Sequence, residues 1–348
     1  MRTKIAALMA ACSLAVTMSA CSAPEGANTE APTSQELNIA CSQQEDFCQK
    51  ITAAFEAATG IKSTYVRLGA GEVLARLQTS TGEFDVWSGG QAENHLKAND
   101  RGFVVPYIST NAGKLDAQYN DAKGIWSGFY TDSVGFCSNT KELAKLGLDA
   151  PTSWDDLLAP QLKGQVSMAH PATAGLGYMA LFTINTLKGG DQAATIDYFK
   201  KLNTNVMQYS KSAATGTEMA GRGEVAVSIA FDSDCVKANK AGMSDLKLTY
   251  PAEGTGYEVG AVSILKDARN EDGAKKYMDW ILTKQAQDLY SSVPSFAAPT
   301  LGDATLGADV PPQNTVKKVD WDTRKAADQR EDFIKAFGDQ VASETKAQ

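Results

Sequence analysis

Short apolar runs alternate along the chain with segments in which apolar residues recur every three or four positions. The run at 37–41 predicts a strand, and the helical spacing over 43–59 predicts a helix that ends at Gly60. The runs at 61–68 and 84–87 predict two more strands, with helical spacing between them. A chain that alternates strand and helix in this way is typical of a parallel sheet with helices on both faces.

A second series with the same alternation follows the first. Its strands are expected at 134–137, 164–168, 206–209, 225–231, 246–250 and 258–265, with helices between them and further helices over 271–289 and 326–346. If the first residues are removed as an export signal, as the next paragraph argues, about 310 to 330 residues remain. Chains of this length usually fold into two lobes rather than around one core. The pattern therefore predicts a two-lobed α/β protein.

The first twenty residues have the layout of a secretory signal. A basic start at 1–4 precedes an uncharged, mostly apolar stretch at 5–20, which ends in small residues. This stretch is too short for a comfortable transmembrane helix, so we expect a signal peptide over 1–20 that directs the protein out of the cytoplasm.

The end of this signal resembles a bacterial lipobox, in which a cysteine becomes the lipidated first residue. The four residues are Met-Ser-Ala-Cys, and Met18 stands where the pattern prefers Leu. We expect lipidation of Cys21, the alternative being an ordinary signal peptide cut nearby. Residues 21–36 are rich in Ala, Pro, Thr and Glu and predict a flexible tether. The protein is then an extracytoplasmic one, anchored to the cell membrane by lipid.

Cysteines outside the export signal indicate disulfide bonds. Four remain, Cys41, Cys48, Cys137 and Cys235. An even count in an oxidising compartment suggests bridges, although four cysteines allow three pairings. The local candidate is Cys41–Cys48, which would pin the corner where a strand turns into a helix; the alternative is two buried free thiols. In the same corner Ser42 and Glu45 fit a capping box, which satisfies free helix amides.

Charge and motifs exclude some classes of function. The formal charge of −8 and the isoelectric point near 5.0 argue against a nucleic-acid binder, but local amides and a few cations still allow a small anionic ligand. Ser138 and Lys141 match the S-x-x-K pattern of β-lactamase-like enzymes, yet K-T-G, S-D-N and G-x-S-x-G are absent and the chain has two histidines. We therefore expect no enzyme, no cofactor and no metal centre, with an exported hydrolase as the remote alternative.

Loops at the carboxyl ends of the predicted strands are the candidate binding site, because ligands of open parallel sheets bind there. Most of these loops are small and rich in glycine or hydroxyls, and several begin a helix, where free N–H groups favour anions. The candidates are Ser42, Gly69, Ala70, Gly71, Glu72, Ser88, Gly89, Thr173, Ala174, Gly175, Ser210, Ser212, Ala213, Asp232, Asp234, Glu253 and Thr255.

The candidates divide into three expected roles. Amides at 69–72, after residue 173 and at 210–213 would hold an anionic group, with Arg67 or Lys211 adding charge. The acids Asp232, Asp234 and Glu253 would accept hydrogen bonds from hydroxyls or an amine, and Ser42, Ser88 and Thr255 would line the opposite walls. The alternative is that these turns carry Gly and Ser for the fold alone, as in any α/β protein.

Six spaced motifs between residues 37 and 292 resemble a known family. They read "CSQQEDFCQ", "FDVWSGG", "PTSWDDLL", "YSKSAATG", "GEVAVSIAFDSD" and "YPAEGTGYEVGAVSI". They resemble the solute-binding proteins of bacterial ABC importers, in the group that includes ferric-ion, 2-aminoethylphosphonate and hexose-phosphate binders. The resemblance implies a type II periplasmic-binding-protein-like fold of two α/β lobes with two crossing strands as a hinge, and a monomer whose partners are permease subunits.

The same resemblance implies a division of the chain. Lobe 1 would take 37–131 plus 266–325, lobe 2 would take 132–265, and 326–348 would form a C-terminal helix and tail. The crossing strands would lie near 130–140 and 257–265. Cys137 and Cys235 then fall close to these segments, so a second bridge is expected as an alternative to free thiols.

The ligand is also suggested by the resemblance. Iron binders of the family use two adjacent tyrosines, and this chain has no Tyr-Tyr. Hexose-phosphate-like members carry an acidic pair at the position of Asp232 and Asp234 and a glutamate near Glu253, but their histidine before that acid is Ser233 or absent here. We therefore expect a small phosphorylated or phosphonate anion, delivered to a permease, with Fe(III) as the alternative transported ligand.

Overall fold

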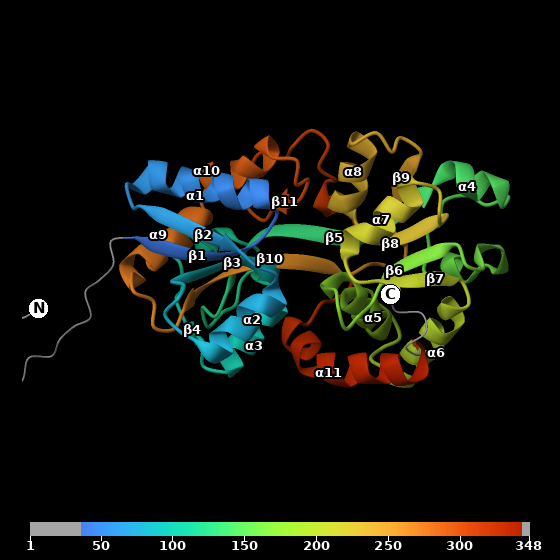
Figure 1. Ribbon diagram of the computed structural model, residues 1–348, viewed down its shortest axis with the longest axis horizontal. Helices are drawn as coiled ribbons and strands as arrows, with labels where there is room; N and C mark the ends of the chain where they lie inside the picture. Colours follow the sequence, from blue (N-terminus) through green and yellow to red (C-terminus); the bar gives the residue numbers. More distant parts are fainter. Residues whose placement is uncertain (1–35, 343–348) are drawn as a thin grey trace, which may run out of the picture. The chain divides into compact units, whose positions relative to one another are not determined.

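The computed structural model describes residues 36–342 of the chain (Figure 1). The expected signal peptide, the lipidation site Cys21 and the tether up to residue 35 lie outside the described residues, as do residues 343–348. In the described part strands and helices alternate as the apolar pattern predicts, so the expected α/β class is confirmed. None of the described helices is both long and apolar enough to cross a membrane.

The described residues form eleven strands, eleven α-helices and six short 3-10 helices. The strands are β1 (Leu37–Ser42), β2 (Ser63–Arg67), β3 (Val86–Gln91), β4 (Val104–Val105), β5 (Ser127–Asn139), β6 (Val166–Ala169), β7 (Val206–Ser210), β8 (Val227–Phe231), β9 (Leu246–Thr249), β10 (Tyr257–Leu265) and β11 (Ala298–Pro299). The α-helices are α1 (Glu45–Thr59), α2 (Ala70–Thr79), α3 (Ala92–Asp100), α4 (Thr140–Lys145), α5 (Gly175–Leu187), α6 (Gln192–Asn203), α7 (Ala213–Gly221), α8 (Asp232–Lys240), α9 (Glu271–Ile281), α10 (Lys284–Gln287) and α11 (Thr323–Gln340). The 3-10 helices are η1 (Ala112–Lys114), η2 (Ala117–Tyr119), η3 (Asp155–Leu158), η4 (Pro160–Leu162), η5 (Asp288–Ser292) and η6 (Gln313–Thr315).

The strands join one mixed sheet with the main order β2-β1-β3-β10-β5-β8-β6-β7. Strand β1 is parallel to β2 and β3, and β6 is parallel to β7 and β8. Between these two groups, β10 is antiparallel to β3 and β5, and β5 is antiparallel to β8 (Figure 1). We call β2, β1 and β3 the first half of the sheet, and β8, β6 and β7 the second half.

Strand β5 lies between the two halves and pairs toward both of them. Its residues up to Ser133 pair with β10, and its residues from Val134 onward pair with β8. All thirteen of its residues are buried. Strand β10 runs beside it in the opposite direction and continues onto β3. The two halves are therefore connected by an antiparallel pair of strands, and each half packs its own aromatic core, around Phe47 in the first and Trp154 in the second.

Helix boundaries differ from the predicted ones where a side chain caps a new helix. The helix expected over 271–289 ends at Ile281, because the Thr283 hydroxyl accepts a hydrogen bond from the Ala286 N–H and begins α10. Helix α11 starts at residue 323 rather than 326, since the Asp322 carboxylate caps it. Helix α11 packs against α3, α5 and α6, and so contacts helices from both halves.

Two disulfides cross-link the described chain. Cys41 at the end of β1 is bonded to Cys48 in α1, and Cys137 in β5 is bonded to Cys235 in α8. All four cysteines are buried. Both expected bridges are present, and the alternative of buried free thiols is wrong for each pair.

Candidate functional site

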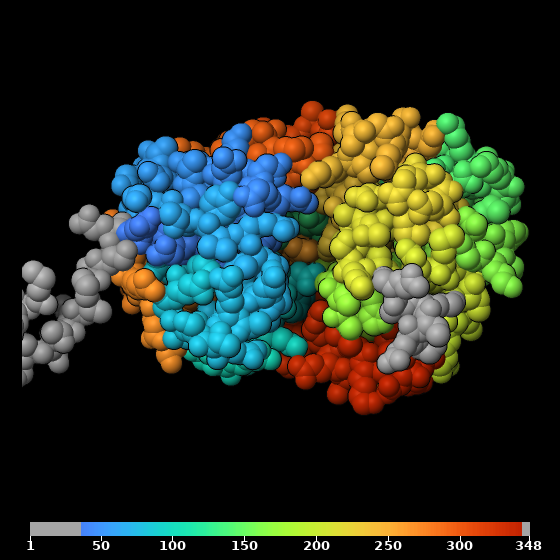
Figure 2. Space-filling view, viewed as in Figure 1, coloured from blue at the N-terminus to red at the C-terminus, as the bar shows by residue number. Residues whose placement is uncertain are grey.

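A pocket of about 410 Å³ lies between residues of the two halves. Figure 2 shows the corresponding hollow between the blue surface of the first half and the yellow surface of the second. The lining residues are Ser42, Gln43, Gln44, Arg67, Leu68, Gly69, Tyr130, Asp132, Ser212, Ala213, Ala214, Phe231, Ser233, Asp234, Glu258, Ser295 and Ala297. Strands β5 and β10 contribute Tyr130, Asp132 and Glu258, so the connecting strands form part of the site.

Four helices begin at this pocket. The N-cap residues of α1, α2, α7 and α8 are Gln44, Gly69, Ser212 and Phe231, and all four line it. None of these residues caps its helix with a side chain that accepts a hydrogen bond from a backbone N–H of the first turn. The first turn of a helix carries unpaired N–H groups and the positive end of the helix dipole. The pocket therefore offers several sets of donors to one anionic group.

Arg67 adds the positive charge. It is the one Lys or Arg among the described residues that line the pocket. Its Nε donates a hydrogen bond to the Gln43 carbonyl oxygen at 3.0 Å, which fixes the guanidinium beside the start of α1. Guanidinium groups form the short, often bidentate contacts that phosphate and carboxylate oxygens favour. Arg67 thus places a positive charge at one part of the pocket, although the chain as a whole is acidic.

Carboxyl groups line another part of the pocket. The Tyr130 hydroxyl donates to Glu258 Oε1 at 2.7 Å, and Asp132 and Asp234 lie in the same lining. Burial raises the pKa of Glu258 to about 7 and that of Asp234 to about 6. Burial, followed by the nearby Asp232 carboxylate, raises the pKa of Asp132 well above its usual range. Such groups can accept hydrogen bonds from hydroxyls or an amine, and donate them when protonated.

Three polar atoms in the lining are buried without a hydrogen-bond partner in the described structure. They are Gln43 Nε2, Asp132 Oδ1 and Ser295 Oγ. Buried polar groups in folded proteins nearly always have partners, and leaving one unpaired costs about 1–3 kcal/mol. A donor, an acceptor and a hydroxyl in one lining are the groups that a polar ligand would satisfy.

Five of the predicted site residues meet in this pocket. Ser42, Gly69, Ser212, Ala213 and Asp234 line it, and they come from both halves of the sheet. The other predicted residues of these loops lie beside them. Ala70 and Gly71 form the first turn of α2, where the Glu72 carboxylate accepts a hydrogen bond from the Gly69 N–H, and the Ser210 hydroxyl donates to the Ser212 carbonyl.

Four predicted residues have side chains that serve the fold instead. Asp232 is fully buried and accepts hydrogen bonds from the N–H groups of Ser133 and Ser233, the Tyr250 hydroxyl and the Gln313 amide. The Glu253 carboxylate accepts from the Trp154 N–H. The buried Thr255 hydroxyl donates to the Val134 carbonyl, and Ser88 Oγ is hydrogen-bonded to the Tyr277 hydroxyl. None of the four lines the pocket.

The remaining predicted residues lie outside the lining as well. Gly89 has a φ of 93°, and its carbonyl is hydrogen-bonded to a ring nitrogen of His95. Thr173 and Ala174 precede α5, which begins at Gly175. A Cβ on Gly175 would come within 2.2 Å of Gln91 Nε2, and Gln91 in turn donates to Glu258 at 3.5 Å. Gly175 therefore influences the pocket through Gln91.

Sequence reasoning missed the residues that the connecting strands bring to the site. Tyr130, Asp132 and Glu258 lie in segments read only as crossing strands, and Ser295 follows η5 in a loop without a motif. Gln43 follows Ser42 at the end of the first predicted strand, but it is not among the predicted site residues. The sequence could have indicated the two acids, because each is the one charged residue in an otherwise uncharged strand, and charged residues are rarely buried without a functional or structural role.

Residues considered for other chemistries do not line the pocket. Ser138 is fully buried in β5, and Lys141 forms an ion pair with Asp245 at 2.9 Å. Two single tyrosines that could have contributed to an iron site, Tyr178 and Tyr209, donate hydrogen bonds to the Ala326 carbonyl and the Asn203 side chain. Among residues 36–342 no group of three or more His, Cys, Asp or Glu side chains is arranged to hold a metal ion.

Comparison with known proteins finds extensive similarity. A family model described as "Bacterial extracellular solute-binding protein" matches residues 90–326. A Haemophilus influenzae protein described as uncharacterized is 35% identical over 315 residues, or 88% of this chain and 90% of its own. A putative 2-aminoethylphosphonate-binding periplasmic protein of Salmonella typhi is 27% identical over 269 residues, covering 72% of this chain and 73% of its own. The structure of the periplasmic binding protein AfuA from Actinobacillus pleuropneumoniae with fructose-6-phosphate bound superimposes with a TM-score of 0.80 at 34% identity, covering 88% of this chain and 99% of that one.

Proposed function

Because this chain belongs to the family of bacterial extracellular solute-binding proteins, we propose that it captures a small phosphorylated solute in the pocket and delivers it to an ABC importer. The expected periplasmic-binding-protein fold is confirmed by the same comparisons, and several of the similar proteins are named as periplasmic binding proteins. Within this class we favour a hexose phosphate over a phosphonate.

The three unpaired polar atoms of the lining carry the proposal. Gln43 Nε2 lies at the start of α1, in the part of the pocket that Arg67 and the helix amides share, and suits a phosphate oxygen. Asp132 Oδ1 belongs to the carboxyl groups and suits a hydroxyl donor. One pocket with an anion-binding part and a hydroxyl-binding part matches a molecule that carries phosphate at one end and hydroxyls at the other.

Carboxyl chemistry favours a sugar over an amine at the second end. Burial raises the pKa of Glu258 to about 7, which keeps this group partly protonated at neutral pH, and burial raises the pKa of Asp132 in the same direction. A protonated carboxyl both donates and accepts, as a sugar hydroxyl does. An ammonium group only donates, and it favours an ionised carboxylate. The fructose-6-phosphate-bound relative at 34% identity supports the same choice.

Thermal unfolding with a panel of solutes tests the proposal. The probes are fructose 6-phosphate, 2-aminoethylphosphonate, inorganic phosphate and ferric citrate. A solute present at a hundredfold its Kd adds about 2.7 kcal/mol, which for a chain of about 310 residues raises Tm by about 4 °C. We expect the largest shift with the hexose phosphate. A shift with ferric citrate alone would favour the iron alternative, and turnover of a probe would favour an enzyme.

A matched pair of charge variants locates the anionic end. Arg67→Gln removes one charge-assisted contact and should weaken fructose 6-phosphate binding about tenfold to a hundredfold. Lys62→Gln makes the same charge change five residues earlier, at an exposed ion pair with Glu36, and should leave the Kd near the wild-type value. Equal effects of the two variants in a calorimetric titration would contradict the assignment of Arg67.

The transport cycle is part of the proposal. Ligand contacts from both halves would favour closure of two lobes about β5 and β10, the strands that connect them. The permease would recognise the closed monomer, held near the membrane by the lipid on Cys21. Crosslinking of the full-length protein to its permease with and without ligand tests this step, and equal yields would contradict it.

A further inference from the structure

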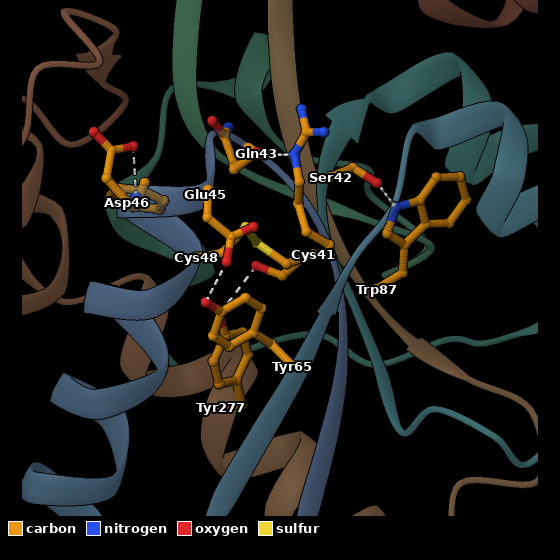
Figure 3. Close-up of a disulfide and its surroundings, with 12 residues drawn as sticks. Cys41, Ser42, Gln43, Glu45, Asp46, Cys48, Tyr65, Trp87 and Tyr277 are labelled. Carbon is orange, nitrogen blue, oxygen red and sulfur yellow. Dashed lines mark hydrogen bonds between the residues drawn. A yellow bond between two sulfur atoms is a disulfide. The ribbon is translucent and has the colours of Figure 1, made fainter.

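The Cys41–Cys48 disulfide closes a short loop that forms part of the pocket lining. Its half-cystines are seven positions apart, and the segment between them contains Ser42, Gln43 and Gln44, all of which line the pocket. Figure 3 shows the bridge near Ser42 and Gln43, where β1 ends and α1 begins. One short cross-linked loop thus supplies three neighbouring pocket residues, including the unpaired Gln43 Nε2.

Few other side-chain contacts hold this loop. The expected capping box is not formed, because the N-cap residue of α1 is Gln44, without a side-chain cap, and Glu45 instead accepts from the Tyr65 hydroxyl. Ser42 Oγ accepts from Trp87 Nε1 at 2.9 Å, and the Gln43 carbonyl accepts from Arg67 at 3.0 Å (Figure 3). Both partners come from other strands, and the Gln44 side chain accepts from Lys237 of α8 at 3.2 Å. The loop is linked to its own helix by the backbone hydrogen bond from Cys48 N–H to the Gln44 carbonyl and by the disulfide, which is the covalent cross-link.

The second disulfide occupies a comparable place but has more support. Cys235 follows Ser233 and Asp234, which line the pocket from the start of α8. Asp232 at the first position of that helix accepts four hydrogen bonds, from two backbone N–H groups, a tyrosine hydroxyl and a glutamine amide. This network holds the start of α8 whether or not the bridge is present. Bridge 137–235 also spans 98 positions, far more than bridge 41–48.

We propose that the Cys41–Cys48 disulfide is a positioning element of the binding site, which holds the 42–44 loop in its ligand-binding conformation. The proposed positioning role rests on the proposed function only in the choice of fructose 6-phosphate as the binding probe. Both sulfurs belong to fully buried residues, so the bridge acts as a permanent brace rather than as a switch open to reductants. Bridge 137–235, in contrast, mainly restricts the unfolded chain, because entropic stabilisation grows with loop length.

Two double variants separate these roles, because we expect one of them to lose more ligand affinity and the other to lose more thermal stability. C41A/C48A should weaken fructose 6-phosphate binding about tenfold, the loss expected when a few pocket groups must be ordered on binding. Its Tm should fall less than that of C137A/C235A. The longer-loop variant should lose more Tm and keep its Kd within about threefold of wild type. Calorimetric titration and thermal unfolding give the two quantities.

Amide hydrogen exchange adds a readout that needs no ligand. In C41A/C48A the amides of residues 42–48 should lose protection while those around Ile51 and Phe55, in the packed part of α1, keep it. The proposal would be overturned if amide protection at 42–48 were unchanged in C41A/C48A, or if this variant did not fold. It would also be overturned if the variant that loses more Tm were also the one that loses more affinity. If wild type binds no phosphate at all, the proposed function fails, and the exchange result still decides the positioning role.

Discussion

Glu258 should make the protein less stable as the pH rises from about 4.5 to about 7. It lies in β10, lines the pocket and accepts a hydrogen bond from Tyr130 at 2.7 Å. Its pKa is raised from 4.5 to about 7, with burial as the largest cause; hydrogen bonds from Tyr130 and Gln91 act in the opposite direction, and the nearby Glu93 adds to the rise. The net rise in pKa shows that the free-energy cost of removing water from the carboxylate is larger than the stabilisation of the carboxylate by these hydrogen bonds.

The sign and size follow from proton linkage. Between pH 4.5 and about 7 the folded protein keeps a proton on Glu258 that the unfolded chain has released. The free energy of unfolding then falls by about 1.4 kcal/mol for each pH unit, or about 3 kcal/mol over the interval. Glu258→Gln keeps an acceptor for Tyr130 and has no charge to desolvate. Its stability relative to wild type should therefore rise by about 3 kcal/mol across this interval and level off above it.

Urea unfolding of both proteins at several pH values measures this difference. Glu331→Gln is the control, since that side chain is exposed in an ion pair with Lys97 and such pairs contribute about 0–1 kcal/mol. A difference between Glu258→Gln and wild type that stays constant from pH 4.5 to about 7 would refute the reasoning that burial dominates at Glu258. If Glu258→Gln also loses affinity for the hexose phosphate, the carboxyl group of Glu258 is needed for binding even though it lowers stability.

Three further changes test the structure. C137A/C235A should lower the free energy of unfolding by about 4.7 kcal/mol, against about 2.5 kcal/mol for the shorter bridge, because the closed loops differ in length; similar losses in urea would contradict the loop-entropy argument. Asp232→Ala should destabilise by about 3 kcal/mol, since four donors lose their acceptor, and Asp232→Asn should cost less in the same assay. Gly175→Ala should displace Gln91 and weaken fructose 6-phosphate binding several-fold with little change in Tm, and an unchanged Kd would show that Gln91 is not needed.

Local features could be predicted from the sequence because their causes are local. The apolar period of residues 43–59 and the stop at Gly60 define α1, and the spacing of Cys41 and Cys48 across a strand–helix corner defines the first bridge. Glycine and serine before α2 and α7 mark Gly69 and Ser212 as helix starts at strand ends, which is where an open sheet places its ligand. These inferences need only neighbours along the chain.

The composition of the pocket was decided by tertiary structure. Asp232, Glu253 and Thr255 look like binding residues in sequence, but donors and acceptors from distant segments already occupy their polar atoms. Asp132 and Glu258 are taken for strand residues, yet pairing of β5 with β10 places both in the pocket. A hydrogen-bonding group is available to a ligand only when no other part of the chain satisfies it, and that depends on which segments the fold brings together.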